Sequence, residues 1–363
     1  MVDQKLNSVS WLENDLEDRY VYTLNSLKRG SESEPIKNSC NYPWRNVYID
    51  TNSKVFICHC DAWIPIPVGD VMQFESIDAV IKSKAAQAIQ STVQNKLYTY
   101  CAVETCGIKH NNKHLDRMML QISLDESCNL ACPSCRRYKI NLNKGYEFLK
   151  KQRELMHIMS WLENYNQEIL ITLSGSGDPL ASLLTRPLFK TYEPKWNQSF
   201  DLKTNGLLLK SIMSDSPMFD YIETFSISID AGSAAVYEDV RRPGKWKNLI
   251  ENLDWLAQKG VQDRVNLLYC FQQKNWRDLA NFQSLVEDYG FRGHIDAIQD
   301  WGTFLKQPIE TPDIWTQQNG YYIDHQVLNY GHEERLPALE ALAQVQTDTI
   351  TLGPELINEL KQK

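Results

Sequence analysis

The sequence predicts an α/β protein in which a cysteine-rich module precedes a parallel sheet. From residue 118 onward, short apolar runs alternate with stretches of helical apolar spacing. Parallel strands need crossover connections, so this alternation favours a series of βα units. Eight of the nine cysteines lie between Cys40 and Cys135, whereas Cys270 stands alone. The cysteine-rich stretch is therefore expected to have a chemistry of its own.

Composition and charge exclude several classes of function. The 46 acidic residues outnumber the 38 basic ones, and the net charge is -8. Nucleic-acid partners usually require a basic excess, so none is expected. No apolar run of about 18 residues is present, and the N-terminus lacks the pattern of a signal peptide. We expect a cytoplasmic protein without a membrane partner, in which clustered cysteines bind metal or take part in chemistry.

Four segments are expected along the chain. They are an N-terminal helical extension (1–37), a cysteine-rich module (38–116), a βα domain (117–305) and a C-terminal tail (306–363) with helices at 336–345 and 354–361. Within the module, the runs NVYID and KVFIC favour strands, and residues 76–96 favour a helix.

Six strands are predicted in the βα domain. They cover residues 118–124, 168–174, 199–205, 221–230, 264–271 and 293–298. Helical spacing separates them at 144–165, 180–190, 246–259 and 276–289. Six strands are fewer than the eight of a complete barrel, so a partial (β/α)6 TIM-like barrel or an open doubly wound sheet fits.

Special residues cluster where the predicted strands end. In either architecture, ligands bind at the carboxyl ends of the strands. The first four strands are followed by Cys128–Cys135, Gly175–Pro179, Thr204–Gly206 and Asp230, respectively. We expect these four segments to converge on one rim.

The strongest motif is the run from Cys128 through Cys132 to Cys135, with the spacing C-x3-C-x2-C. Three thiolates on one short loop can bind three corners of a cubane iron–sulfur cluster and leave one iron open. An open coordination site is typical of a catalytic metal. A zinc loop completed by His110 or His114 is the alternative, and the spacing favours the cluster.

This motif resembles the signature of the radical S-adenosylmethionine (SAM) enzymes. The run Ser174-Gly-Ser-Gly-Asp-Pro179 is similar to the family's GGEP motif, which binds the methionyl amino group. Thr204-Asn205-Gly206 resembles its TNG element, and the segment from Phe225 to Arg241 resembles the one that contacts ribose and carboxylate. The resemblance assigns cofactor binding to Gly175, Ser176, Gly177, Asp178, Thr204, Asn205, Ser228, Asp230 and Arg241.

The sequence departs from the family pattern in two places. Ser134 occupies a position that is usually aromatic and lies against the adenine. Ser176 and Asp178 replace the usual second Gly and Glu. Backbone carbonyls can still receive the amino group, so SAM binding is expected to survive.

The resemblance also implies the chemistry. In this family the open iron chelates SAM, and one electron from the reduced [4Fe–4S] cluster splits the sulfonium to give a 5′-deoxyadenosyl radical. The radical abstracts hydrogen from a substrate carbon. An external electron donor of the flavodoxin or ferredoxin type is then required.

The cysteine-rich module resembles the start of a SPASM or twitch domain. The matching runs are Cys40-Asn-Tyr-Pro-Trp44 and Asn52–Cys58, in which Ser53 replaces the usual Gly. The resemblance implies one auxiliary iron–sulfur cluster, with Cys40, Cys58, Cys101 and Cys106 as ligands and Cys60 left open. In the family this module follows the barrel, whereas here it precedes it. A structural zinc knot is the alternative.

Cys270 lies in the predicted fifth strand. Strand alternation places it on one face with Asn266, Leu268 and Gln272. A buried cysteine is usually a small hydrophobic residue. The functional alternative is a catalytic thiol that gives a hydrogen atom to a substrate radical, as in the epimerases of this family.

SPASM and twitch domains are commonest in enzymes that mature ribosomally made peptide natural products. A peptide precursor is therefore the expected substrate, and epimerisation, crosslinking or oxidation is the expected outcome. The same chemistry on a sugar or aminocyclitol is the second interpretation. A zinc-binding scaffold without activity is the third.

Overall fold

The computed structural model describes residues 36–59, 63–136, 139–173, 177–298, 326–328, 333–345 and 347–361. The predicted N-terminal helical extension lies almost wholly outside these residues, as do Cys60, Gly175, Ser176 and the first part of the C-terminal tail. The chain divides into two compact units whose sequences interleave. The first contains described residues up to 125, with 143–173 and 195–199. The second contains 126–136, 139–142, 177–194 and those from 200 onward.

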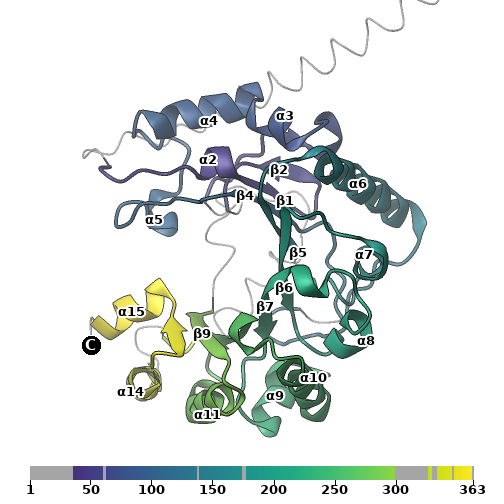
Figure 1. The fold of residues 1–363 in the computed structure, drawn as a ribbon. Helices are drawn as coiled ribbons and strands as arrows, with labels where there is room; N and C mark the ends of the chain where they lie inside the picture. Colours follow the sequence, from purple (N-terminus) through teal and green to yellow (C-terminus); the bar gives the residue numbers. More distant parts are fainter. Residues whose placement is uncertain are drawn as a thin grey trace, which may run out of the picture. The chain divides into compact units, whose positions relative to one another are not determined.

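The sheet of the first unit joins the cysteine-rich module to the βα domain. Its strands are β1 (Asn46–Ile49), β2 (Lys54–Phe56), β3 (Gly69–Asp70), β4 (Met118–Ile122) and β5 (Ile169–Leu173), in the order β5-β4-β1-β2-β3. β1 runs parallel to β4 and antiparallel to β2, as Figure 1 shows. The sequence did not predict the β1–β4 pairing. Because of it, the first unit extends beyond the boundary expected at residue 116, and the four-segment division remains a prediction.

The helices of the first unit are α2 (Tyr42–Arg45), η1 (Val71–Gln73), α3 (Ile77–Ile81), α4 (Lys84–Gln94), α5 (Val103–Cys106) and α6 (Gly145–Asn164). The helix expected over 76–96 is divided in two. The hydroxyl of Ser76 caps α3, and that of Ser83 caps α4. Each accepts from a backbone N–H in the first turn, as N-cap residues do.

The second unit contains a parallel sheet. Its strands are β6 (Gln198–Thr204), which belongs to this unit from Phe200 onward, β7 (Ile222–Ser228), β8 (Val265–Phe271), β9 (Arg292–Ala297) and β10 (Ile350–Leu352), in that order. Neighbouring strands run parallel throughout. All six predicted strands are present as β4–β9, so the α/β class is confirmed, and β10 is an addition.

The helices of the second unit include all five that the sequence predicts, and two short helices, at 209–213 and 234–240, were not predicted. The helices of this unit are η2 (Phe219–Tyr221), η3 (Gln262–Arg264), η4 (Trp276–Asp278), α7 (Arg186–Thr191), α8 (Leu209–Met213), α9 (Ala234–Val240), α10 (Trp246–Gln258), α11 (Leu279–Tyr289), α14 (Arg335–Gln344) and α15 (Pro354–Lys361). The helix expected over 180–190 starts only at Arg186, because Asp178 binds the backbone N–H groups of Leu180 and Ala181 in a turn. No helix in the described part of the chain has the length and apolarity needed to cross a bilayer.

The two faces of the second unit's sheet differ in polarity. Buried and half-buried residues alternate along β6 and β8. The fully buried face carries large apolar side chains such as Phe200, Leu267 and Phe271. The other face is mostly polar and, beside the apolar Leu268, carries Asp201, Lys203, Ser226, Asn266, Cys270, His294 and Asp296. Cys270 is on the face that the alternation predicted.

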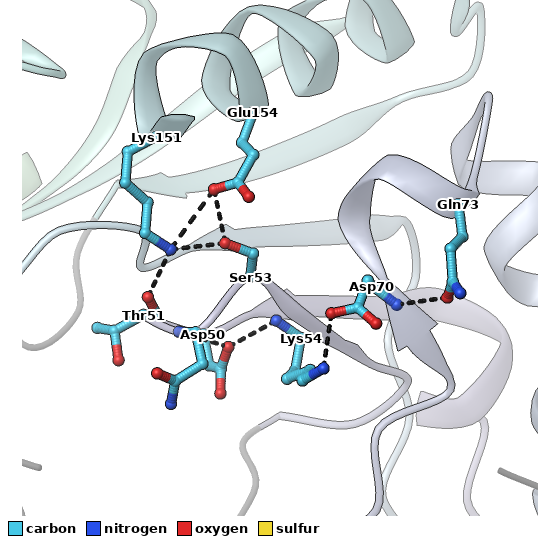
Figure 2. A network of polar contacts seen from close by, with 9 residues as sticks. Asp50, Thr51, Ser53, Lys54, Asp70, Gln73, Lys151 and Glu154 are labelled. Carbon is cyan, nitrogen blue, oxygen red and sulfur yellow. Dashed lines mark hydrogen bonds and ion pairs between the residues drawn. The ribbon is translucent and has the colours of Figure 1, made fainter. Parts of the chain in front are cut away.

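A buried polar network ties the β1–β2 turn to α6 (Figure 2). Ser53 has a φ of 63°, a left-handed conformation that favours glycine. Its hydroxyl donates to a Glu154 carboxylate oxygen at 2.6 Å and accepts from Lys151 Nζ at 2.6 Å. Lys151 Nζ also donates to the carbonyl of Thr51 at 2.6 Å. The serine therefore offsets its backbone strain by satisfying two buried charged groups.

Replacing Ser53 should separate these two effects. We expect Ser53→Ala to lower the free energy of unfolding by about 1–3 kcal/mol, because it keeps the strain and removes both hydrogen bonds. Ser53→Gly should cost less, since glycine removes a strain of about 1 kcal/mol. Urea denaturation measures both. Ser91→Ala, on an exposed part of α4, is the control and should change stability by less than about 0.5 kcal/mol. Equal losses for the two Ser53 variants would contradict the strain argument.

Candidate functional site

The three cysteines of the C-x3-C-x2-C motif lie on one loop of the second unit. The N–H groups of Cys135 and Arg136 both donate to the carbonyl of Cys132 at 2.9 Å, so the second and third cysteines share one turn. The Cys128 N–H donates to Ile140 O at 2.9 Å. Backbone hydrogen bonds therefore hold the loop at both ends.

Each of the three sulfurs has a polar donor beside it. Cys128 Sγ accepts from Leu130 N at 3.4 Å, and Cys135 Sγ accepts from Arg136 Nε at 3.4 Å. A guanidinium nitrogen of Arg241 lies 4.0 Å from Cys132 Sγ. Donors of this kind stabilise thiolates and tune the potential of a cluster that they hold.

Burial raises the pKa of two of these thiols. The pKa of Cys132 rises to about 12, and that of Cys128 also lies above its usual value, chiefly because the thiolate is desolvated. Metal ligation requires the thiolate, so iron must displace these protons on binding. The nearby guanidinium of Arg241 acts in the opposite direction on Cys132.

Asp178 connects the cysteine loop to two other segments. Its N–H donates to Ser127 O at 2.8 Å. One carboxylate oxygen accepts from Thr204 Oγ1 at 2.9 Å and from Asn205 N at 2.7 Å, and the other accepts from the turn that precedes α7. The side chain is only 4% exposed. Burial raises the pKa of this carboxyl, and the four donors oppose that shift.

Asn205 extends this connection to the sulfurs. Its Nδ2 donates to Asn129 Oδ1 at 2.7 Å and lies 3.9 Å from Cys128 Sγ. Thr204 is the last residue of β6 and Asn205 follows it, so the end of this strand contacts the cysteine loop directly. Two of the four segments expected at the rim, the cysteine loop and the end of β6, therefore lie next to each other.

Asp230, two residues after the end of β7, connects a second group of residues. One carboxylate oxygen lies 2.6 Å from a guanidinium nitrogen of Arg241, and the other accepts from Cys270 N at 2.7 Å. Asp230 has a φ of 53°, a region that aspartate visits more readily than most residues. Its backbone carbonyl accepts from Asn275 Nδ2 at 3.0 Å. Arg241 and Cys270 are thereby joined through one carboxylate.

Three buried polar atoms of the second unit lack a partner among the described residues. They are Arg241 Nε, the Tyr237 hydroxyl and Gln272 Nε2. Such groups are costly unless a ligand or water satisfies them. Arg241 reaches from Asp230 towards Cys132 and keeps an unsatisfied N–H, which suits an anionic or carbonyl-bearing ligand beside the cysteine loop.

The remaining predicted cofactor residues are placed as follows. Ser228 ends β7 and is half-buried, and Gly177 immediately precedes Asp178. Gly175 and Ser176 lie outside the described residues. The contacts also identify Arg136 and Asn129 as residues of the site that sequence reasoning missed. Both lie within or directly after the cysteine motif, which is the signal that could have indicated them.

Cys270 carries a neutral thiol. Burial raises its pKa well above the usual value, and the carboxylate of Asp230 raises it further. Asp296, its partner across the parallel pair of β8 and β9, lies on the same face. His294 contacts this carboxylate through Nε2 at 2.9 Å.

A second group of cysteines meets in the first unit. Cys40, Cys58, Cys101 and Cys106 all line one pocket that is partly open to solvent. The aromatic rings of Tyr42, Trp63 and Tyr98 line the same pocket. Burial raises the pKa of Cys40 to about 11 and also raises that of Cys106. The sequence-predicted ligand set is therefore gathered at one place, and Cys60 lies outside the described residues.

A site for a single metal ion would need several ligands around one point. Among the described residues, no three His, Cys, Asp or Glu side chains converge as ligands of one metal ion would. A cubane cluster binds each thiolate at a different iron, so its ligands need not converge on one point. Of the histidines considered for a zinc loop, His114 contacts Ser39 Oγ at 2.8 Å and His110 is exposed.

Comparison with known proteins gives two family matches. The model of the radical SAM superfamily matches residues 122–286. The model of an iron–sulfur cluster-binding domain, SPASM, matches residues 40–107. No curated protein matches the chain.

Two solved structures resemble parts of the chain. TYW1 with a lysine-pyruvate adduct bound has 18% identity and a TM-score of 0.33, over 47% of this chain and 61% of that one. A radical SAM methyltransferase from Sphaerobacter thermophilus has 10% identity and a TM-score of 0.36, over 64% of this chain and 65% of that one. The chain thus spans less than two thirds of either structure.

Proposed function

We propose that this chain, which belongs to the radical SAM superfamily and carries an iron–sulfur SPASM domain at its N-terminal side, abstracts hydrogen from a carbon of a ribosomally made peptide precursor. The family's cofactors are a [4Fe–4S] cluster, SAM and an auxiliary iron–sulfur cluster. When bound, they supply a 5′-deoxyadenosyl radical through one-electron cleavage of the sulfonium. The observation that carries the proposal is the unpaired, buried Arg241 guanidinium N–H beside Cys132.

The residues of the second unit suit these cofactors. Cys128, Cys132 and Cys135 would hold three irons of the catalytic cluster. Asp230 fixes Arg241, so the remaining donor of Arg241 is oriented in advance for the carboxylate of SAM. Ser228 would contact the ribose.

The carboxylate of Asp178 has a positioning role. Both oxygens of Asp178 are occupied by donors of the protein itself, so its side chain positions Thr204 and Asn205. The methionyl amino group would then be received by the backbone of the Gly175–Asp178 segment.

The polar face of the β6–β9 sheet supports a polar substrate. Hydroxyl, amide and charged groups occur along this face, and Cys270 lies among them. A peptide offers amide groups that such a face can bind. A sugar or aminocyclitol offers hydroxyl and amino groups to the same face, and it is the second candidate for this reason.

Two features favour different outcomes. The neutral thiol of Cys270 is suited to giving a hydrogen atom, as epimerisation requires. The cysteine pocket of the first unit, as the site of the auxiliary cluster, favours oxidation. Either outcome requires an external electron donor, for which a flavodoxin or ferredoxin is proposed.

The first prediction concerns the catalytic cluster. Anaerobically reconstituted wild-type protein should contain about eight irons, and Cys132→Ala should contain about four, because one [4Fe–4S] cluster is lost. All formation of 5′-deoxyadenosine should disappear with it, as chromatography of the reaction measures. Cys270→Ala serves as the matched control and should keep its iron. Turnover retained by Cys132→Ala would refute this site.

The second prediction concerns Cys270. In an epimerising enzyme, Cys270→Ala should keep SAM cleavage but abolish deuterium incorporation from D2O into the product, because the exchangeable S–H is the hydrogen donor. Mass spectrometry of the product measures this. Cys270→Ser preserves the packing and should behave like the alanine variant. Product formation unchanged in both variants would mean that the thiol only fills space.

The third prediction concerns the substrate class. Short ribosomal peptides should increase 5′-deoxyadenosine formation above the uncoupled rate, because a substrate carbon then receives the radical. Aminocyclitols and nucleotide-linked sugars are compared at equal concentration. Stimulation by these small molecules and not by peptides would replace the peptide proposal with the second candidate.

A further inference from the structure

The four-cysteine pocket of the first unit has an apolar lining with one exception. Tyr42, Pro43, Trp63, Ile64, Tyr98 and Ile108 surround the cysteines. Lys113 is the one basic side chain among the described residues that line this pocket. Next to apolar side chains, a positive charge acts on a neighbouring charge more strongly than it would in bulk water.

The backbone holds Lys113 alongside Cys40. Lys113 N donates to Ser39 O at 2.9 Å, and Asn41 N donates to Lys113 O at 2.9 Å. These two bonds form a parallel bridge in which Cys40 and Lys113 are direct partners. The Asn41 side chain strengthens the attachment, since its amide exchanges hydrogen bonds of 2.8 and 2.9 Å with the backbone of Leu115. The lysine is thus positioned by its backbone next to a proposed ligand.

The side chain of Lys113 is directed by an aromatic ring of the same pocket. Its Nζ lies 5.4 Å from the centroid of the Trp63 ring, within the range of a cation–π interaction. Trp63 in turn stacks on Tyr42, with the ring centroids 6.0 Å apart. Lys113 therefore lines the same pocket as all four cysteines, beside the ring of Trp63.

We propose that Lys113 raises the reduction potential of the auxiliary cluster held in this pocket. Reduction adds one electron, and therefore one negative charge, to a cluster that already carries thiolates. The fixed ammonium stabilises the reduced form more than the oxidised form, since Coulomb attraction grows with the charge. A higher potential makes the cluster the better electron acceptor, which favours an oxidative outcome. The inference rests on the proposed ligands Cys40, Cys58, Cys101 and Cys106.

The test compares Lys113→Met with Lys113→Arg in the reconstituted full chain. Both variants carry Cys132→Ala in addition, so that the auxiliary cluster alone contributes to the spectrum. Methionine is unbranched like lysine and removes the charge, whereas arginine keeps the charge. Redox titration followed by electron paramagnetic resonance gives the midpoint potential, and iron analysis gives the cluster content.

We expect Lys113→Met to reduce the equilibrium constant for one-electron reduction at least tenfold, a fall of 59 mV in potential. Lys113→Arg should stay near the parent value. Where the methionine variant fails to hold iron, Lys113→Gln provides the same comparison with a polar side chain. Equal potentials at equal iron content would overturn the role of Lys113 alone. Absence of auxiliary iron from the Cys132→Ala parent would overturn the ligand assignment, and the role of Lys113 with it.

Discussion

The candidate site of the second unit depends on one buried carboxylate. Asp178 receives four hydrogen bonds from its own turn and from the segment after β6, and its N–H binds the residue before Cys128. Each of these segments is a loop, and loops at strand ends have few contacts of their own to fix them. Removing a partner from a buried hydrogen-bonded group costs about 1–3 kcal/mol. The carboxylate therefore helps to hold Asn205 against the cysteine loop, together with the direct bond from Asn205 to Asn129.

Asp230 likewise connects segments near the end of β7, but it binds Arg241 and the backbone of Cys270. It shares its oxygens between Arg241 and the backbone of Cys270, so it orients one charged donor and one strand. Arg241 keeps an unsatisfied N–H, whereas all the oxygens of Asp178 are used within the protein. The first carboxylate thus stabilises the rim, and the second prepares it for a ligand.

The sequence predicted where the strands of the βα domain occur along the chain and which residues follow them. These features are predictable because period-2 and helical apolar patterns are local signals. It could not predict the β1–β4 pairing, since the two strands are far apart in the chain and their pairing depends on tertiary packing. The role of Asp178 was also hidden, because a motif shows which residue types are present and not which of their atoms are already bonded. Ser53 was noted as a replacement for glycine, but its buried contact with Lys151 and Glu154 needed coordinates.

The protonation state of Cys270 bears directly on the chemistry that it can perform. A hydrogen atom can be given only by a thiol, since a thiolate has no S–H bond to break. Burial and the nearby Asp230 carboxylate keep the thiol protonated, while the hydrogen bond to Asp230 is made by the backbone N–H and not by the sulfur. The same carboxylate holds Arg241 beside Cys132. One residue near the end of β7 therefore positions the proposed SAM contact and helps to keep the proposed hydrogen donor protonated, although Arg241 and Cys270 lie in different elements.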